Sequence, residues 1–344
     1  MLNAPWLSVI LPTYNGEAFL GACLESLISQ PVDDLEVIAV DDGSTDDTIA
    51  ILEHFAGRLP LQILQPNRCA NWIRGTNLGL SAARGEYLCF LHQDDVWLPG
   101  RASKLRQLSA HWPAAAAIIH PCKFIDVDGR HLGYWRCPFS SNTRQLSRDE
   151  VFHSLLVQNF LTVGAPLFKR TTVEQIGVLD ESLWFTADWD FWLKLSQAGS
   201  WVYCPEVLSG FRLHPLSQTV QSSSHSREHR MQFDKVLARY LSDVNLPQRT
   251  VQVARFSAEL NIQLAECFHA RRLPWAFLLL SGFRLGPRGW LEFYRASRIV
   301  ERILPRMRLW FSGMLRTSNH SAKFSYATES AQTAPQEKKE QRAA

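Results

Sequence analysis

The fold is decided by one stretch, LEVIAVDDGSTDDTIAILEHF, at residues 35–55. It predicts a strand, a polar turn and a helix, because an apolar run of strand length gives way to acidic and small residues and then to helically spaced apolar ones. The same order recurs around it. WLSVILP (6–12) precedes a helical pattern over residues 17–27, and LQILQ (61–65) precedes one over residues 75–83. This repeated alternation predicts a mostly parallel sheet with helices on its faces.

Polar residues follow three of the predicted strands. They are Thr13-Tyr14-Asn15, Asp41-Asp42 and, after the apolar run at 87–91, Asp94-Asp95. In open α/β sheets ligands bind beyond the carboxyl ends of the strands, so we expect these clusters to share one crevice. Adjacent carboxylates are costly to desolvate, and Mg²⁺ and Mn²⁺ prefer carboxylate and phosphate oxygens. The pattern therefore suggests a divalent cation, Mn²⁺ or Mg²⁺, and a phosphorylated ligand.

Composition narrows the class of protein. A chain of 344 residues that is 46% hydrophobic can bury one large core or two smaller ones. The net charge of +3 does not indicate a nucleic-acid partner. Seven scattered cysteines without a CxxC pair argue against a disulfide framework and for a reducing cytosol. No apolar run approaches the roughly 20 residues of a membrane span, and no secretory signal is recognised. We expect a cytoplasmic location.

The last third has a different character. A polar linker candidate at 222–229 is followed by helical patterns with no strand signal, and Pro305 is expected to bend or end a helix. Arg284–Arg316 holds eight arginines and two acids among aromatic and aliphatic residues. Two interpretations stay open: a helix lying on the membrane and attracted to anionic lipid, or a helical subdomain packed on the core. The polar tail, 317–344, is predicted to be disordered.

Five motifs together resemble the family 2 glycosyltransferases. They are SVILPTYNGEAFLGACLESLISQ (8–30), LEVIAVDDGSTDDT (35–48), NLGLSAARGEYLCFLHQDD (77–95), DWDFWLKL (188–195) and FRLHP (211–215). The resemblance implies a GT-A fold, with a mixed, mostly parallel sheet flanked by helices, over residues 1–220. A helical C-terminal region then occupies 221–316. It also implies an inverting enzyme that takes a sugar from a UDP-, GDP- or dTDP-sugar.

The resemblance also assigns roles to single residues. Thr13 and Tyr14 should line the nucleobase pocket, and Asp42 should accept a hydrogen bond from the base. Asp94 should face the ribose and Asp95 should bind the metal. These are the residues expected on the nucleotide side of the site.

Further roles fall on later motifs and on one helix. By the resemblance Asp188 is the general base, Arg212 meets the diphosphate and His214 reaches the metal. Asp190, two residues along the same helix as Asp188, must point to a different side and is expected to support that helix. Arg74, near the start of the helix before residue 87, is a candidate phosphate contact, with an ordinary surface arginine as the alternative.

The acceptor is expected around residues 125–165, with a lipid-linked or polysaccharide glycan of the cell envelope as the expected class. Tyr134, Trp135 and Arg136 offer a sugar or lipid-phosphate platform, with loop residues covering the core as the alternative. Other classes remain open: a degenerate, membrane-associated nucleotide-binding scaffold, or a metal-dependent phosphoryl or nucleotidyl transferase. The phosphoryl transferase would want a nucleophilic Asp after the first strand, where residues 12–15 are PTYN.

Overall fold

In the computed structural model, residues 4–31, 33–68, 71–215, 217, 226–242, 246–270 and 275–311 are described. The boundary predicted at 220/221 and the tail 317–344 lie outside them. The large sheet is mixed, as expected, and its strands run in the spatial order β3 (Leu61–Leu64), β2 (Leu35–Asp41), β1 (Leu7–Thr13), β4 (Tyr87–Phe90), β10 (Leu167–Lys169), β6 (Ala117–Ile119), β11 (Trp201–Tyr203), β9 (Arg144–Leu146). The first four strands are parallel, and β10 is antiparallel to both β4 and β6.

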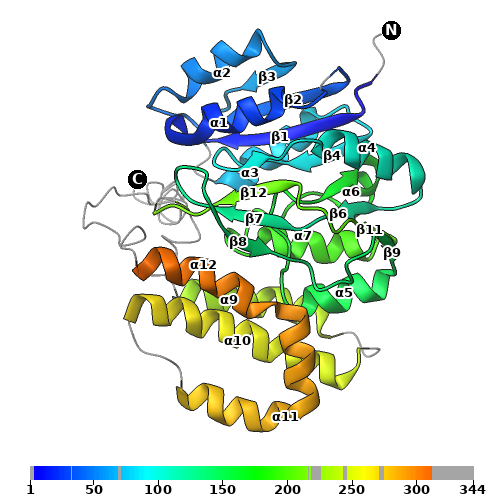
Figure 1. Ribbon diagram of the computed structural model, residues 1–344, viewed down its shortest axis with the longest axis vertical. Coiled ribbons are helices and arrows are strands. Elements are labelled where there is room, and N and C mark those ends of the chain that lie inside the picture. Colours follow the sequence, from blue (N-terminus) through cyan, green and yellow to red (C-terminus); the bar gives the residue numbers. More distant parts are fainter. Residues whose placement is uncertain are drawn as a thin grey trace, which may run out of the picture.

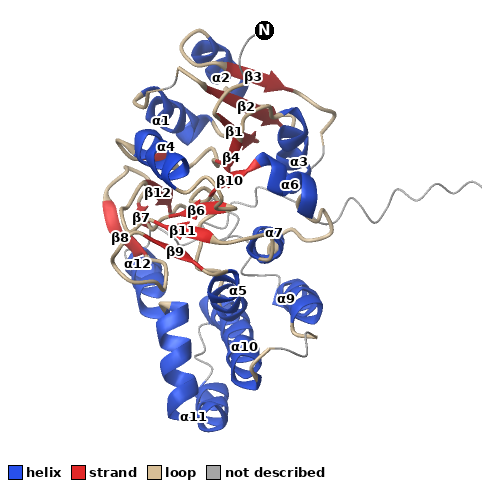
Figure 2. Cartoon of the chain, turned by 90° about the vertical axis from the view of Figure 1, so that its right-hand side faces the viewer, coloured by secondary structure: helices blue, strands red, loops and turns tan. Residues whose placement is uncertain are grey.

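Helices cover both faces of this sheet (Figure 2). On one side lie α1 (Glu17–Ile28), α2 (Thr48–Ala56) and α4 (Arg101–His111). On the other lie α3 (Trp72–Ala82), α5 (Arg148–Val157), α6 (Arg170–Ile176) and α7 (Ala187–Ser196). Alternate residues of a strand point to opposite faces, so in β1 Val9 packs toward α1 whereas Ile10 packs toward α3. Two apolar cores therefore sandwich the sheet.

A second, smaller sheet stands beside the first, in the order β5 (Val96–Trp97), β12 (Ser209–Arg212), β7 (Cys122–Ile125), β8 (His131–Trp135). β5 directly follows the turn after β4, and it pairs with β12, which comes much later in the chain. This pairing brings the FRLHP segment to the end of β4.

A buried carboxylate ties together the amino-terminal ends of β1 and β2. Glu36 Oε1 accepts hydrogen bonds from the Ser8 hydroxyl and the Arg84 amide, both at 2.7 Å, and the Arg84 guanidinium pairs with Oε2. Burial raises the pKa of Glu36, but these bonds and the charge of Arg84 outweigh it and leave the pKa below its usual value.

Four helices form the C-terminal part: α9 (Ser226–Tyr240), α10 (Gln248–Ala270), α11 (Trp275–Ser297) and α12 (Ile299–Phe311) (Figure 1). α10 packs on α5 and α11, with Phe256 and Phe293 in the shared core. α12 does not end at Pro305, whose ring packs against Gly133 of β8; the break before α12 falls at Arg298, where φ is 48°. Within the described ranges, no helix is both long and apolar enough to cross a bilayer.

The basic face of α12 is partly a packing surface. The guanidinium groups of Arg302 and Arg306 lie 5.3 and 5.4 Å from the centre of the Trp135 ring, and burial lowers their pKa values to about 9 and about 10. Val300 and Leu304 of the same helix are exposed. One side of α12 therefore packs on the core, as the interpretation of a packed helical subdomain requires. The other side meets solvent, so the interpretation of a membrane-surface helix also stays open. Residues 312–316 of the basic segment are not described.

Candidate active site

Asp94 and Asp95 lie in the turn between β4 and β5. Every residue of β4 is buried, and the chain turns immediately after it, with the Asp95 amide donating to the His92 carbonyl at 3.1 Å. Because β5 pairs with β12, Asp95 Oδ1 accepts a 2.9 Å hydrogen bond from the backbone amide of Arg212. The two acids and the Arg212–His214 segment are therefore neighbours. The motifs assigned these residues to one site, and such a site requires this proximity.

Asp95 is only 5% exposed. Burial, followed by the charge of Asp94, raises its pKa well above the usual range. Burial and the charge of Asp94 thus disfavour the ionised form of Asp95. A cation bound beside Asp95 would favour the ionised form and lower its pKa.

Asp94 has a different environment. Its Oδ2 lies 2.9 Å from His214 Nε2. Burial raises the pKa of Asp94, but the hydrogen bond and charge of His214 outweigh it and hold the pKa below its usual value. The His214 ring packs on Phe19 at 4.7 Å, and its buried Nδ1 has no hydrogen-bond partner among the described residues. His214 is therefore oriented through Nε2, and its Nδ1 has no described partner.

Arg212 is buried and holds the surrounding backbone. Its Nε donates to the Asp94 carbonyl at 2.8 Å, and its Nη1 donates to the Asp126 and Val127 carbonyls at 2.9 and 3.0 Å. The guanidinium also lies over the Phe19 ring. The predicted diphosphate contact would fall to the remaining nitrogen, Nη2.

The residues expected to bind the nucleotide lie at the ends of β1 and β2. Thr13 pairs with Asp41 in the parallel register, and its Oγ1 donates to Asp41 Oδ1 at 3.1 Å. The Asp41 carboxylate also accepts the Gly43 and Ser44 amides, so this residue shapes the turn. Asp42 is buried, with its amide donating to the Thr13 carbonyl.

Tyr14 is held from two directions. Gln93 bonds both its amide and its carbonyl at 2.9 Å, and the Arg68 guanidinium lies 5.3 Å from the centre of its ring. Since Gln93 directly precedes Asp94, the ends of β1 and β4 are fixed to each other here. The three polar clusters are therefore adjacent at the ends of β1, β2 and β4.

Asp188 occupies the first turn of α7. Phe191 and Trp192 of this helix pack on Phe90, the last residue of β4, so the helix is seated against the end of the strand that leads to Asp94. Asp188 Oδ2 accepts a 2.8 Å hydrogen bond from Asn159 Nδ2. Burial raises the pKa of Asp188 to about 6, with the Asn159 bond acting against the rise.

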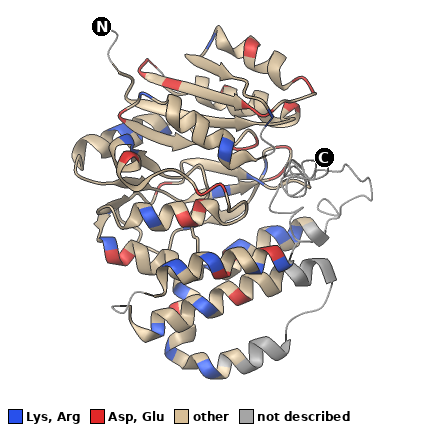
Figure 3. Ribbon diagram, turned by 180° about the vertical axis from the view of Figure 1, so that it is seen from behind, with Lys and Arg blue, Asp and Glu red and all other residues tan. Residues whose placement is uncertain are grey.

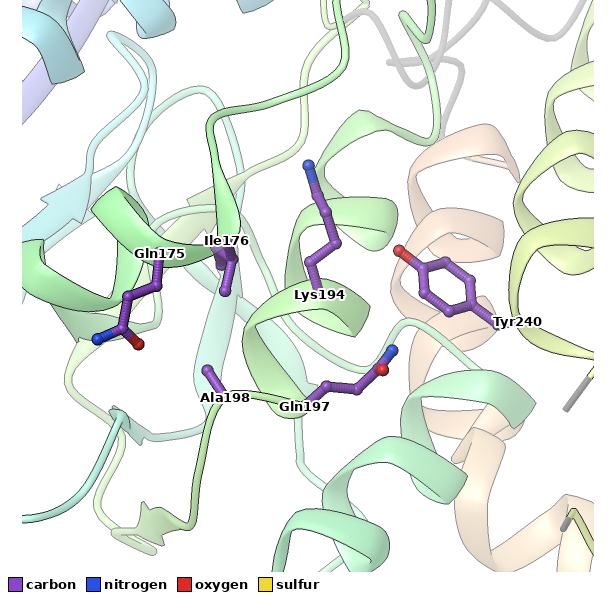
Figure 4. Close-up of a pocket in the computed structure, with 6 residues that line it drawn as sticks. All are labelled: Gln175, Ile176, Lys194, Gln197, Ala198 and Tyr240. Atoms are coloured by element: carbon purple, nitrogen blue, oxygen red, sulfur yellow. The ribbon is translucent and has the colours of Figure 1, made fainter.

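Asp190 points elsewhere. It is fully buried, and its Oδ1 accepts hydrogen bonds from Arg239 Nη1 at 2.9 Å and from the Tyr240 hydroxyl at 3.0 Å, both on α9. A pocket of about 420 Å³ adjoins this network between α6, α7 and α9 (Figure 4). Its lining consists of Gln175, Ile176, Lys194, Gln197, Ala198 and Tyr240. None of the predicted site residues lines it, so it belongs to helix packing.

Two sequence candidates stand apart from this geometry. Arg74 is exposed in the first turn of α3 and has no hydrogen bond or ion pair to the described residues. Trp135 was a candidate for an acceptor platform, with a residue covering the core as the alternative, and the structure supports the alternative. Its ring stacks on Phe124 at 5.4 Å beneath Arg302 and is 9% exposed, because α12 covers this face of the small sheet.

Sequence reasoning missed Asn159, Gln93 and Arg68. Asn159 lies 29 residues before Asp188 in a segment with no motif, so only the packing of α5 against α7 brings the two together. Gln93 lies inside the HQDD motif, directly before the two acids, and nothing in the sequence shows that its amide bonds the backbone of Tyr14.

The donor atoms fit a divalent cation whose shell is completed by a substrate. The described residues contain no group of three or more His, Cys, Asp or Glu side chains placed to hold a metal by themselves. Two donor atoms among them have no partner described above, the second oxygen of Asp95 and the buried Nδ1 of His214. Mg²⁺ and Mn²⁺ are commonly held by one or two protein ligands plus phosphate oxygens.

A mixed sheet with acids after β2 and β4 and a carboxylate on the packed α7 is the arrangement of a glycosyltransferase of the GT-A fold. Residues 8–161 match the model described as Glycosyl transferase family 2. An uncharacterized glycosyltransferase of Rickettsia typhi is 28% identical over 220 residues, which are 63% of this chain and 66% of that protein.

Solved structures share the fold. Residues 1–349 of S. aureus TarS in complex with UDP superpose with a TM-score of 0.58 at 17% identity, covering 90% of this chain and 88% of that one. The mannosyltransferase PcManGT from Pyrobaculum calidifontis, in complex with GDP-Man and Mn²⁺, gives a TM-score of 0.54 at 19% identity with the same coverage. At these identities the likeness concerns the fold alone.

Proposed function

We propose that the protein is an inverting glycosyltransferase that moves a sugar from a nucleoside-diphosphate donor to a hydroxyl of a lipid-linked or polysaccharide glycan. The observation that carries the proposal is the corner after β4, where His214 meets Asp94 and the Arg212 amide meets Asp95, together with the packing of α7, which bears Asp188, on the last residue of β4. The complexes of the two fold neighbours with UDP and with GDP-Man and Mn²⁺ support this class of donor.

In the proposed reaction Asp188 is the general base. With its pKa raised to about 6, the carboxylate is mostly ionised at neutral pH and is more basic than an ordinary aspartate. Asn159 holds Oδ2, which leaves Oδ1 to accept the proton of the attacking hydroxyl. Attack on the side opposite the leaving diphosphate inverts the anomeric carbon, and the diphosphate departs without needing a proton.

The remaining residues bind and orient the donor. Thr13, Tyr14 and Asp42 take the base, Asp94 faces the ribose, and Arg212 and the exposed Arg74 lie toward the phosphates. Asp95 and His214 would hold Mn²⁺ or Mg²⁺, which neutralises charge on the leaving diphosphate when bound. Asp190 keeps α7 in position through its bonds to α9.

For the acceptor, we favour a lipid-linked glycan met at the cytoplasmic face of a membrane. Arginines recur on the C-terminal helices (Figure 3), and large apolar side chains of α11 and α12 are exposed beside them. The combination is typical of a peripheral membrane surface. A cell-envelope polysaccharide is the corresponding class of product.

The test is nucleotide binding followed by turnover. UDP, GDP and dTDP are added with and without Mn²⁺ while thermal unfolding is recorded; a ligand at about a hundred times its Kd adds about 2.7 kcal/mol of stability. We expect one nucleotide to stabilise the protein only with Mn²⁺, and Asp95→Ala to remove this effect. The matched control is Asp149→Ala, which removes an exposed acid of α5.

A panel of sugar nucleotides with Mn²⁺ then reports donor hydrolysis or transfer. Wild-type turnover that Asp188→Asn abolishes supports the proposal. Nucleotide binding without turnover of any donor would instead favour the scaffold alternative, and full transfer by Asp188→Asn would refute the base assignment.

A further inference from the structure

A second pocket lies away from the nucleotide crevice, where α5, α10 and α11 meet. Its volume is about 430 Å³. Its lining consists of Pro138, Ser154, Arg249, Arg288, Leu291, Glu292, Arg295 and Ala296. None of the residues assigned to sugar transfer is among them, so the pocket requires its own explanation.

Three of the lining side chains are arginines without partners. Arg249, Arg288 and Arg295 are exposed, and within the described part of the chain they make no hydrogen bond or ion pair. Nearby arginines behave differently; Arg230, for example, forms a two-pronged bridge to Glu259. The lining has one carboxylate, Glu292, so its formal charge is +2.

The positions of these arginines are fixed by helix geometry. Arg288, Leu291 and Arg295 are spaced i, i+3, i+7 on the half of α11 that follows its break at Gly286, so they share one face. Arg249 comes from the first turn of α10, where the positive end of the helix dipole also favours an anion. A guanidinium group can bind a phosphate through two parallel N–H···O hydrogen bonds.

The exposed surface of α11, which carries two of these arginines, is apolar as well as basic. Leu291 is 49% exposed and Tyr294, on the next turn, is 58% exposed, while Phe283 before the break is 94% exposed. A site for a small soluble anion has no need of large apolar side chains in water. A membrane surface does use them, because apolar side chains enter the acyl boundary while arginines meet the headgroups.

We propose that this pocket binds the phosphate of an anionic lipid headgroup and so docks the C-terminal helices on the membrane. Arg249, Arg288 and Arg295 hold the phosphate, and Leu291 and Tyr294 insert beside it. The inference rests on the proposed membrane association and not on the transfer chemistry, so its test needs no donor or acceptor.

The test uses the full chain and vesicle co-sedimentation. Vesicles of phosphatidylcholine alone are compared with vesicles containing phosphatidylglycerol. We expect binding only to the second kind, and Arg288→Gln/Arg295→Gln should weaken it by about ten- to thirty-fold, from about 1 kcal/mol per arginine near an anionic surface. The matched control, Arg227→Gln/Arg255→Gln, removes the same charge from exposed helix positions outside the pocket and should change binding by less than about threefold.

Several results would overturn the proposal. Equal loss in both double variants would mean general charge attraction with no specific pocket. If the protein does not bind phosphatidylglycerol vesicles, the pocket is not a lipid site. If inorganic phosphate or glycerol phosphate stabilises the protein without vesicle binding, the ligand is a soluble phosphate and the lipid assignment is wrong. Circular dichroism of each variant checks folding, and the single variant Arg249→Gln, from a different helix, provides an independent reading. Nucleotide-induced stabilisation should be unchanged throughout, which separates this result from the proposed transfer function.

Discussion

Replacing Asn159 by alanine tests whether the environment of Asp188 sets the pH dependence of the reaction. The Asn159 side chain donates the one hydrogen bond from another side chain that is described for the Asp188 carboxylate, at 2.8 Å. That bond lowers the pKa of Asp188, which burial raises to about 6. Without it, only the solvent and the backbone offset burial, so the pKa must rise further.

The size of the rise follows from the strength of the bond. A hydrogen bond to a charged group contributes about 1.5–3 kcal/mol, which corresponds to about one to two pKa units. The pKa of Asp188 would then lie at about 7–8. At pH 7 the ionised fraction of the base falls from about 90% to between about 50% and 10%, so kcat/KM falls about two- to ninefold. At pH 9 both proteins carry an ionised base, and their rates should converge.

The assay is the pH profile of kcat/KM for the donor found in the sugar-nucleotide panel, with Mn²⁺ present. We expect the acidic limb of the Asn159→Ala profile to move toward higher pH by about one to two units with little change in the plateau. Asn77→Ala is the matched control. Its amide bonds the Leu179 carbonyl and Glu181, away from α7, so its profile should coincide with that of the wild type.

A merely structural role for Asn159 would lower the plateau at every pH and leave the limb in place. That outcome, or an unshifted limb with full activity, would refute the assignment of Asp188 as the titrating base.

Three further predictions concern stability, each measured by urea unfolding. Gly79→Ala should destabilise the protein by about 1–3 kcal/mol, because a Cβ there would lie 2.5 Å from Ile10 Cγ2, whereas Gly21→Ala, with open space around it, should not. Glu36→Gln should be destabilising at pH 7. Because folding lowers the pKa of Glu36, the carboxylate stabilises the protein at pH values above its ordinary pKa of about 4.3. This stabilisation should be lost as the pH falls below that value and through the lowered pKa of the folded state. Asp190→Ala leaves a guanidinium on α9 without one of its carboxylates and should cost about 3 kcal/mol; a loss of activity with unchanged stability would contradict its supporting role.

The first half of the catalytic domain could be predicted from the sequence because its signals are local. The strand and helix bounds from β1 to β4 follow the predicted ranges within three residues, and the helix of Asp188 and Asp190 begins at its motif. The crevice at the strand ends then follows from parallel topology.

The remaining elements could not be predicted, because they pair with segments far away in the sequence. The small sheet joins β5 to β12, and no feature of either two- to four-residue strand identifies its partner. The sequence left Trp135 either in an acceptor platform or in the cover of the core, because it gives no sign that α12 lies over this residue. Pro305 was expected to disturb its helix, yet the same ring fills the space above Gly133.

The β5–β12 pairing also bears on the order in which the protein can mature during synthesis. Asp95 and the amide that binds it are separated by 117 positions in the chain. The strands β1 to β4 all lie within the first 90 residues, so they can pair before the rest of the chain has been made. The corner formed by Asp94, Asp95 and His214 cannot, because Arg212 and His214 arrive only after all eight strands of the large sheet have been made. A nascent chain therefore carries a nearly complete sheet well before it acquires a competent site.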